Sequence, residues 1–104
     1  MQERRATQRF RVDLRVRWET LQSQGRGSVC DLSSSGCFVL TSDDVRAGEL
    51  VRFEVVLNDQ VVPLWGQVIY RISEMGFAVR FVFEGEDDER FLNQLIETMN
   101  PTSV

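Results

Sequence analysis

The sequence has no histidine, no lysine, and only two cysteines and two prolines among its 104 residues. Histidine is the usual general base and the usual partner of a nucleophilic serine or cysteine, so its absence removes the commonest catalytic arrangements. No pair of acidic residues is singled out by its spacing within an apolar setting, and no other part of an active site is visible. We therefore expect a small binding module and not an enzyme.

The two cysteines, Cys30 and Cys37, are too few for a disulfide framework. Without histidine they also cannot complete the four ligands of a structural zinc site, so we expect no metal and no cofactor. We interpret both as reduced thiols. Two arrangements stay open: the thiols face each other across a hairpin, or each is a small buried hydrophobic side chain.

Long apolar runs are missing as well. The longest, such as 81–83, have only a few residues, whereas roughly 20 are needed to cross a bilayer. The first residues turn polar and charged, without the apolar segment and the cleavage site of a secretory signal. We expect a cytoplasmic protein without a membrane span, and the length and ordinary composition predict one globular domain over residues 1–104.

The charges are distributed unevenly along the chain. Residues 1–18 carry a net charge of +4, and residues 84–97 carry −5, within an overall charge of −4. All twelve basic residues are arginine. Arginine suits planar, bidentate contacts to phosphate or guanine, although a GC-rich genome produces the same preference.

Strict alternation of apolar and charged residues predicts a half-buried strand from Phe10 to Glu19. The charged face of this strand includes Arg11, Arg15 and Arg17, which we interpret as a solvated surface. Further short strands, separated by turns, predict an antiparallel sandwich or barrel. They are expected at 28–30, 37–40, 50–57, 61–70 and 76–83.

Glycine and proline set the expected boundaries of these strands. Two glycines among polar residues predict a turn from Gln22 to Gly27, and the stretch from Asp31 to Gly36 is expected to separate two strands. Pro63 indicates that its strand begins late or lies at an edge. Apolar residues recur at helical spacing near the end of the chain, behind the acidic residues 86–89, which favour a helix start through the helix dipole. We expect a helix over residues 86–99, and no metal site in the acidic run.

Two short motifs flank the first strands. Arg5 and Arg9 form an Arg-x-x-x-Arg pair, and, with 21 residues between Arg9 and Asp31, the residues Asp31, Ser33 and Gly36 form Asp-x-Ser-x-x-Gly. Each motif alone has an ordinary explanation, because twelve arginines produce such a pair by chance and the second string is typical of a turn. In combination, at this spacing, they resemble the signature of the PilZ family of cyclic di-GMP receptors.

The resemblance implies a fold and a set of ligand contacts. The fold is mainly β: a six-stranded antiparallel barrel of the split-barrel type over 10–83 with a C-terminal helix. Arg5 and Arg9 would grip a phosphate or the O6/N7 edge of guanine bidentately. Asp31 would accept the N1 and N2 protons of guanine, and Ser33 would supply a hydroxyl group. Gly36 has two possible roles, a positive φ or a close approach of its backbone to the ligand.

The N-terminal residues 1–9 are expected to be flexible without ligand and to become ordered over the barrel when cyclic di-GMP binds. Arg4 adds a third cation, which either stacks on a base or extends into solvent. In the family, the residue before the arginine pair is thought to influence whether one cyclic di-GMP or an intercalated pair is held. Arg4 fits the pair.

The implied function is that of a bacterial receptor, which transmits the level of cyclic di-GMP to an unidentified partner protein and so controls motility, pili, exopolysaccharide or development. One alternative is a PilZ-like adaptor that binds protein without nucleotide, against which the intact motif argues. Another is a small-barrel nucleic-acid binder. The acidic remainder of the chain and the isoelectric point near 4.8 oppose it, so we expect no nucleic-acid partner.

A titration with cyclic di-GMP is expected to reach two ligands per chain, because Arg4 adds positive charge against four phosphates and a planar group for stacking. The Arg4→Leu variant should still bind but at a lower ratio. Isothermal titration calorimetry measures both ratios. Saturation of the unmodified chain at one ligand would contradict the role given to Arg4.

Overall fold

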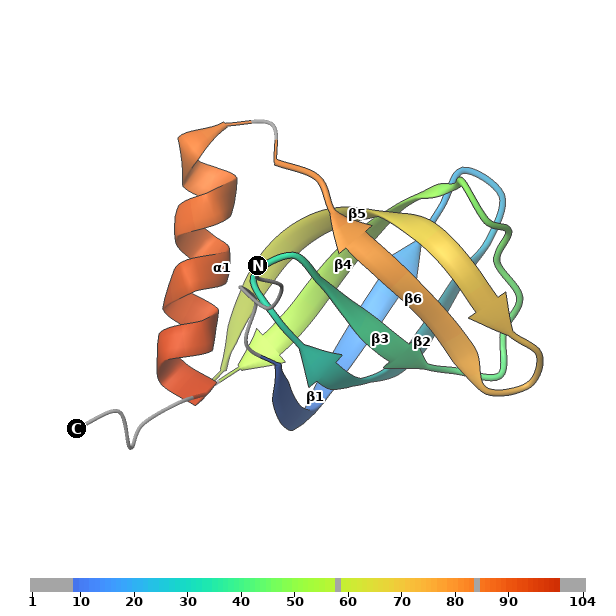
Figure 1. The fold of residues 1–104 in the computed structure, drawn as a ribbon, viewed down its shortest axis with the longest axis horizontal. Coiled ribbons are helices and arrows are strands. Elements are labelled where there is room, and N and C mark those ends of the chain that lie inside the picture. The colour runs from blue at the N-terminus through green and yellow to red at the C-terminus, as the bar shows by residue number, and fades with distance from the viewer. Residues whose placement is uncertain (1–8, 58, 84, 100–104) are drawn as a thin grey trace, which may run out of the picture.

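The computed structural model describes residues 9–57, 59–83 and 85–99, and all structural statements below concern this part of the chain. Six antiparallel strands close into a barrel in the order β1-β2-β3-β6-β5-β4, and helix α1 lies at one end of it (Figure 1). The elements are β1 (Phe10–Glu19), β2 (Gln24–Leu32), β3 (Gly36–Leu40), β4 (Leu50–Leu57), β5 (Gln60–Ile72), β6 (Gly76–Phe81) and α1 (Glu86–Met99). The prediction of a six-stranded antiparallel barrel with a C-terminal helix is confirmed.

The alternating sequence of β1 explains how this strand lies in the wall of the barrel. Leu14, Val16 and Trp18 are buried in the core, and the charged residues between them are exposed. A strand has a period of two, so one face packs inside the barrel while the other meets solvent. The half-buried strand predicted from Phe10 to Glu19 is therefore confirmed.

Three aromatic rings form the centre of the core. Phe77 lies edge-on to Trp18 with ring centroids 5.4 Å apart, and it stacks against Phe53 at 6.4 Å. Leu92 and Leu95 bring the apolar side of α1 into the same cluster of buried residues. The strands alone thus leave one end of the core open, and the helix covers it (Figure 1). No helix in the described residues has the length and apolar character required of a bilayer span.

The glycines of the first hairpin lie in a strand and not in a turn. β2 begins at Gln24, so the predicted turn from Gln22 to Gly27 is wrong from Gln24 onwards. A Cβ atom at Gly25 would lie 2.7 Å from Cζ2 of Trp18, and one at Gly27 would collide with the carbonyl oxygen of Leu40. These glycines therefore allow tight packing within a regular strand, a use that local sequence does not distinguish from turn formation.

Pro63 also lies inside a strand. β5 begins at Gln60, so the strand does not start after the proline as one of the two interpretations required. Pro63 is paired with Glu54 of β4, whereas pairing with β6 begins only at Gly66. At Pro63 the strand therefore has a strand neighbour on one side only, which is the edge position where proline is tolerated.

Phe77→Ala tests the packing of the aromatic centre. Removing this fully buried ring is expected to lower the free energy of unfolding by about 3–5 kcal/mol, because contacts to two other rings are lost and a cavity remains. Urea denaturation followed by tryptophan fluorescence measures the change. Leu21→Ala, at a fully exposed residue of the first hairpin turn, is the control and should change stability by less than about 0.5 kcal/mol. Equal effects in the two variants would contradict the packing described here.

Candidate functional site

Segments that are distant in the sequence meet at a pocket of about 340 Å³ on the barrel wall. Arg9 reaches it from the residue before β1, Asp31 from the end of β2, and Gly36 from the start of β3. The neighbouring strands β6 and β5 contribute further lining residues, among them Arg80 and Tyr70. Three of the predicted motif residues, Arg9, Asp31 and Gly36, thus line one pocket.

Arg9 and Asp31 form an ion pair that joins the two motifs. The Nη1 atom of Arg9 lies 3.0 Å from Oδ2 of Asp31 and donates a hydrogen bond to it. The side chain of Arg9 is 65% exposed and that of Asp31 is 36% exposed, so only Arg9 is largely solvent-facing. Arg4 and Arg5, the other cations of the predicted site, lie outside the described residues.

A β-bulge determines how Asp31 is presented. The pairing of β2 with β3 shifts between Val29 and Asp31, which leaves Cys30 as the extra residue. Bulges re-aim the side chains that follow them, and here Cys30 and Asp31 both line the pocket. While Oδ2 of Asp31 binds Arg9, Oδ1 is buried and has no hydrogen-bond donor among the described residues. An unsatisfied buried carboxylate oxygen is costly, so Asp31 is held here in an energetically unfavourable arrangement.

Ser33 uses its hydroxyl group inside the loop between β2 and β3. Its Oγ accepts hydrogen bonds from the backbone N–H groups of Ser35 and Gly36, both at 3.2 Å. The backbone N–H of Ser33 in turn donates to the carbonyl oxygen of Gly36 at 2.9 Å. The side chain is buried, and the loop is shorter than the predicted Asp31 to Gly36. Ser33 therefore fixes the turn on which the neighbouring site residues are placed.

Gly36 brings β3 close to β6. Its φ does not lie in the left-handed region, so the first of its two expected roles is wrong. A Cβ atom at this position would collide with the carbonyl oxygen of Val79. The loop is tied to the same strand, because the backbone N–H of Phe81 donates to the carbonyl oxygen of Ser35 at 2.8 Å. The close approach that glycine permits here is to the backbone of β6.

Sequence reasoning missed the pocket residues outside the two motifs, which come from β3, β5 and β6. Arg80 lines it and is the register partner of Gly36 in the neighbouring strand. Phe38 and Tyr70 form an aromatic pair with centroids 6.5 Å apart. Tyr70 and Ile69 are both exposed because a bulge interrupts the pairing of β5 with β6 between Val68 and Tyr70. The only signal in the sequence was that Ile69 and Tyr70 are adjacent and both apolar, whereas strict alternation predicts one inward and one outward side chain.

Both cysteines border the pocket as free thiols. Cys37 is buried, and Cys30 is half-buried. Burial raises the pKa of the Cys37 thiol, and the nearby carboxylate of Asp31 raises it further. The thiol is therefore protonated at neutral pH and behaves as a small hydrophobic side chain. Within the described ranges, no three Cys, Asp or Glu side chains are grouped so that they could hold a metal ion.

The family model of the PilZ domain matches residues 3–98, which include both motifs and the whole barrel. The chain belongs to the PilZ domain family. No curated protein matches the sequence significantly.

Solved structures of PilZ domains share this fold. The PilZ domain of YcgR from Escherichia coli, solved with c-di-GMP, is 20% identical with a TM-score of 0.80, and the match covers 95% of this chain and 93% of that one. The PilZ domain of CeSA from a cellulose-synthesizing bacterium is 18% identical with a TM-score of 0.79, covering 89% and 98%. MotI from Bacillus subtilis, an inhibitor of motility, is 18% identical with a TM-score of 0.69, covering 98% of this chain and 54% of its own. At these identities the likeness concerns the fold.

Ser33→Ala tests the structural role of the motif serine in this PilZ domain. The buried N–H of Gly36 and the half-buried N–H of Ser35 lose their acceptor, so the free energy of unfolding should fall by about 1–3 kcal/mol. Ser34→Ala is a matched control one residue away, because Ser34 is exposed and makes no hydrogen bond with the described part of the chain. Urea denaturation of both variants decides the matter. A loss no larger at Ser33 than at Ser34 would refute the assigned role.

Proposed function

We propose that this chain is a receptor domain that binds cyclic di-GMP in the pocket between Arg9, Asp31 and Arg80, and that it is not an enzyme. The observation that supports the proposal is the ion pair of Arg9 with Asp31 at the mouth of this pocket. It joins a cation suited to phosphate and a carboxylate suited to guanine, from motifs that are 22 positions apart in the sequence. The PilZ domain of YcgR, which shares the fold, is described with c-di-GMP.

The phosphates of the ligand would be held by arginine. Arg9 and Arg80 both line the pocket, from the segment before β1 and from β6. Each guanidinium can give two parallel, charge-assisted hydrogen bonds to a phosphate. Arg5, the other member of the motif pair, and Arg4 would add charge from the N-terminal segment. On binding, Arg9 would exchange part of its contact with Asp31 for a phosphate oxygen.

Asp31 would read the guanine base. A guanine presents two neighbouring N–H donors, at N1 and N2, and an ionised carboxylate accepts both. Oδ1 of Asp31 is the buried oxygen without a donor, so the base would satisfy it. Adenine presents an acceptor at N1 beside its single amino group, which would face the carboxylate unfavourably. We therefore propose that the site selects cyclic di-GMP over cyclic di-AMP.

The aromatic pair would supply a stacking surface. Phe38 and Tyr70 line the pocket beside the exposed Ile69 and Met75. Bases stack on aromatic faces with a gain of about 1–3 kcal/mol per base. Ser33 and Gly36 would contribute by shaping the loop and closing the barrel, through the contacts described above.

Signal transmission would involve the N-terminal segment. Residues 1–9 carry Arg4, Arg5 and Arg9, and bound phosphates would draw them towards the barrel. The new surface would be recognised by a partner protein in the cytoplasm, with motility, pili, exopolysaccharide or development as the process controlled. A second messenger acts in this way by favouring one of two states of a segment.

Arg9→Ala and Asp31→Ala are each expected to weaken cyclic di-GMP binding about ten-fold or more, because each removes one partner of a charge-assisted hydrogen bond. Calorimetry with cyclic di-GMP measures the loss, and parallel titrations with cyclic di-AMP and GTP should show no comparable binding.

Arg15→Ala and Asp13→Ala are matched controls, since both side chains are exposed on β1 and neither lines the pocket. They change the net charge equally and should bind like the unmodified chain. The site assignment fails if Arg9→Ala or Asp31→Ala keeps full affinity. It also fails if the controls lose as much, because binding would then depend on net charge alone.

A further inference from the structure

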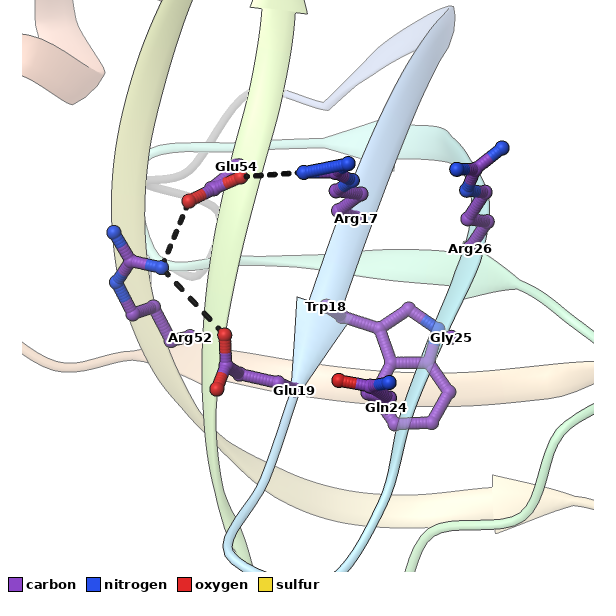
Figure 2. Close-up of a pocket in the computed structure, with 8 residues that line it drawn as sticks. All are labelled: Arg17, Trp18, Glu19, Gln24, Gly25, Arg26, Arg52 and Glu54. Carbon is purple, nitrogen blue, oxygen red and sulfur yellow. Dashed lines mark hydrogen bonds and ion pairs between the residues drawn. The ribbon is translucent and has the colours of Figure 1, made fainter.

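A second depression, of about 440 Å³, lies at the other end of the β1–β2 hairpin from the Arg9–Asp31 pair. Its walls are the ends of β1, β2 and β4 (Figure 2). Along β1, Arg17 is eight positions from Arg9, which corresponds to about 25 Å of extended strand. The two sites share no lining residue and lie at different ends of the β1–β2 strand pair.

Four charged side chains in this depression neutralise one another. Nη1 of Arg52 lies 2.9 Å from Oε2 of Glu54 and 3.7 Å from Oε1 of Glu19. Nη1 of Arg17 lies 3.6 Å from Oε1 of Glu54 (Figure 2). The register explains the network, because Arg17 is opposite Glu54 and Glu19 is opposite Arg52 on the outer face of the β1–β4 pair. Two positive and two negative charges are accounted for in this way.

Arg26 adds a positive charge that this network does not balance. It is the register partner of Arg17 on β2, and Figure 2 shows the two guanidinium groups on the same side of neighbouring strands. Like charges directly opposite each other destabilise a strand pair. Among the described residues, no carboxylate lies within ion-pair distance of Arg26. Arg17 keeps free donors as well, since its one ion pair is long.

The outer face continues from this depression to an exposed indole. Trp65 on β5 is the register partner of Arg52, and 38% of its surface is exposed. Tryptophan and arginine are the residues most enriched among the energetic centres of protein interfaces. The face thus combines an unbalanced cation with an aromatic anchor one strand away.

We propose that this depression is a docking site for an acidic peptide segment of a partner protein, with one carboxylate held between Arg17 and Arg26. The planar fork of a guanidinium matches a carboxylate in a bidentate arrangement. Three arginines and two glutamates line the depression, and the surplus of one positive charge fits one carboxylate. A phosphate dianion would be repelled by Glu19 and Glu54. The same two glutamates can instead accept the backbone N–H groups of a peptide.

The proposal does not rest on cyclic di-GMP binding, because none of the residues that carry it lines the other pocket. It gives the receptor a contact surface for protein that exists without ligand. A partner held there would remain next to the strand whose other end carries Arg9.

Nuclear magnetic resonance titration of the full chain, labelled with 15N, tests the proposal. The probe is a short peptide of alternating aspartate and serine with both ends blocked, and its counterpart has asparagine in place of aspartate. The acidic peptide should shift the amide signals of Arg17, Gly25 and Arg26, and the neutral peptide should not. Arg26→Gln should weaken binding about five-fold, the effect of one exposed ion pair. Cyclic di-GMP affinity in that variant should stay unchanged.

Arg46→Gln is the matched control. Arg46 is exposed in the loop between β3 and β4, does not line the depression, and carries the same charge. Equal weakening in Arg46→Gln and Arg26→Gln would overturn the proposal, since attraction would then follow net charge. Signals that shift as strongly with inorganic phosphate would overturn the peptide as the occupant, and concentration-dependent broadening without any probe would indicate a second copy of this chain instead.

Discussion

β3 and β6 approach each other so closely at Gly36 that a single added carbon atom would collide with the backbone of Val79. This strand pair is one of the two, with β1–β4, that join β1–β3 to β4–β6 in the closed barrel, and β3 is only five residues long. Any displacement at its first residue would therefore affect the whole pair. The same contact places Arg80 beside the loop that follows Asp31 and Leu32. The fold and the pocket thus depend on one position where two backbones must almost touch.

Irregular pairing shapes the site as much as regular pairing does. The ladder shifts between Val29 and Asp31, and again between Val68 and Tyr70. Both shifts border the pocket, and each places two successive side chains on its surface. A perfectly alternating barrel would turn one member of each pair inward. The bulges therefore convert part of a structural wall into a surface with both polar and aromatic groups.

The predictable parts of this structure are those governed by local periodicity. Alternation in β1 and helical spacing in α1 each act over a few neighbouring residues, and both elements were expected at their observed bounds. Gly25 and Gly27 were misjudged because their reason for being small is the ring of Trp18 and the backbone of Leu40, contacts made across strands.

The candidate site divides in the same way. Arg9 and Asp31 were recognised through the spacing of two motifs, and the structure brings them together. Arg80 and Tyr70 reach the pocket only through the register of β6 and β5 and through a bulge, which no short stretch of sequence encodes. Arg17 is a solvated charge by local pattern, and its position opposite Arg26 exists only once β1 and β2 are aligned.

The hydrogen bonds of Ser33 have a consequence for classifying relatives by their sequences. Ser33 and Gly36 make contacts that shape the loop and the β3–β6 pair, so the fold requires both residues whether or not a ligand binds. Sequence comparisons of PilZ domains should therefore score the arginine and aspartate positions separately from the serine and glycine, because the architecture by itself already requires the second two.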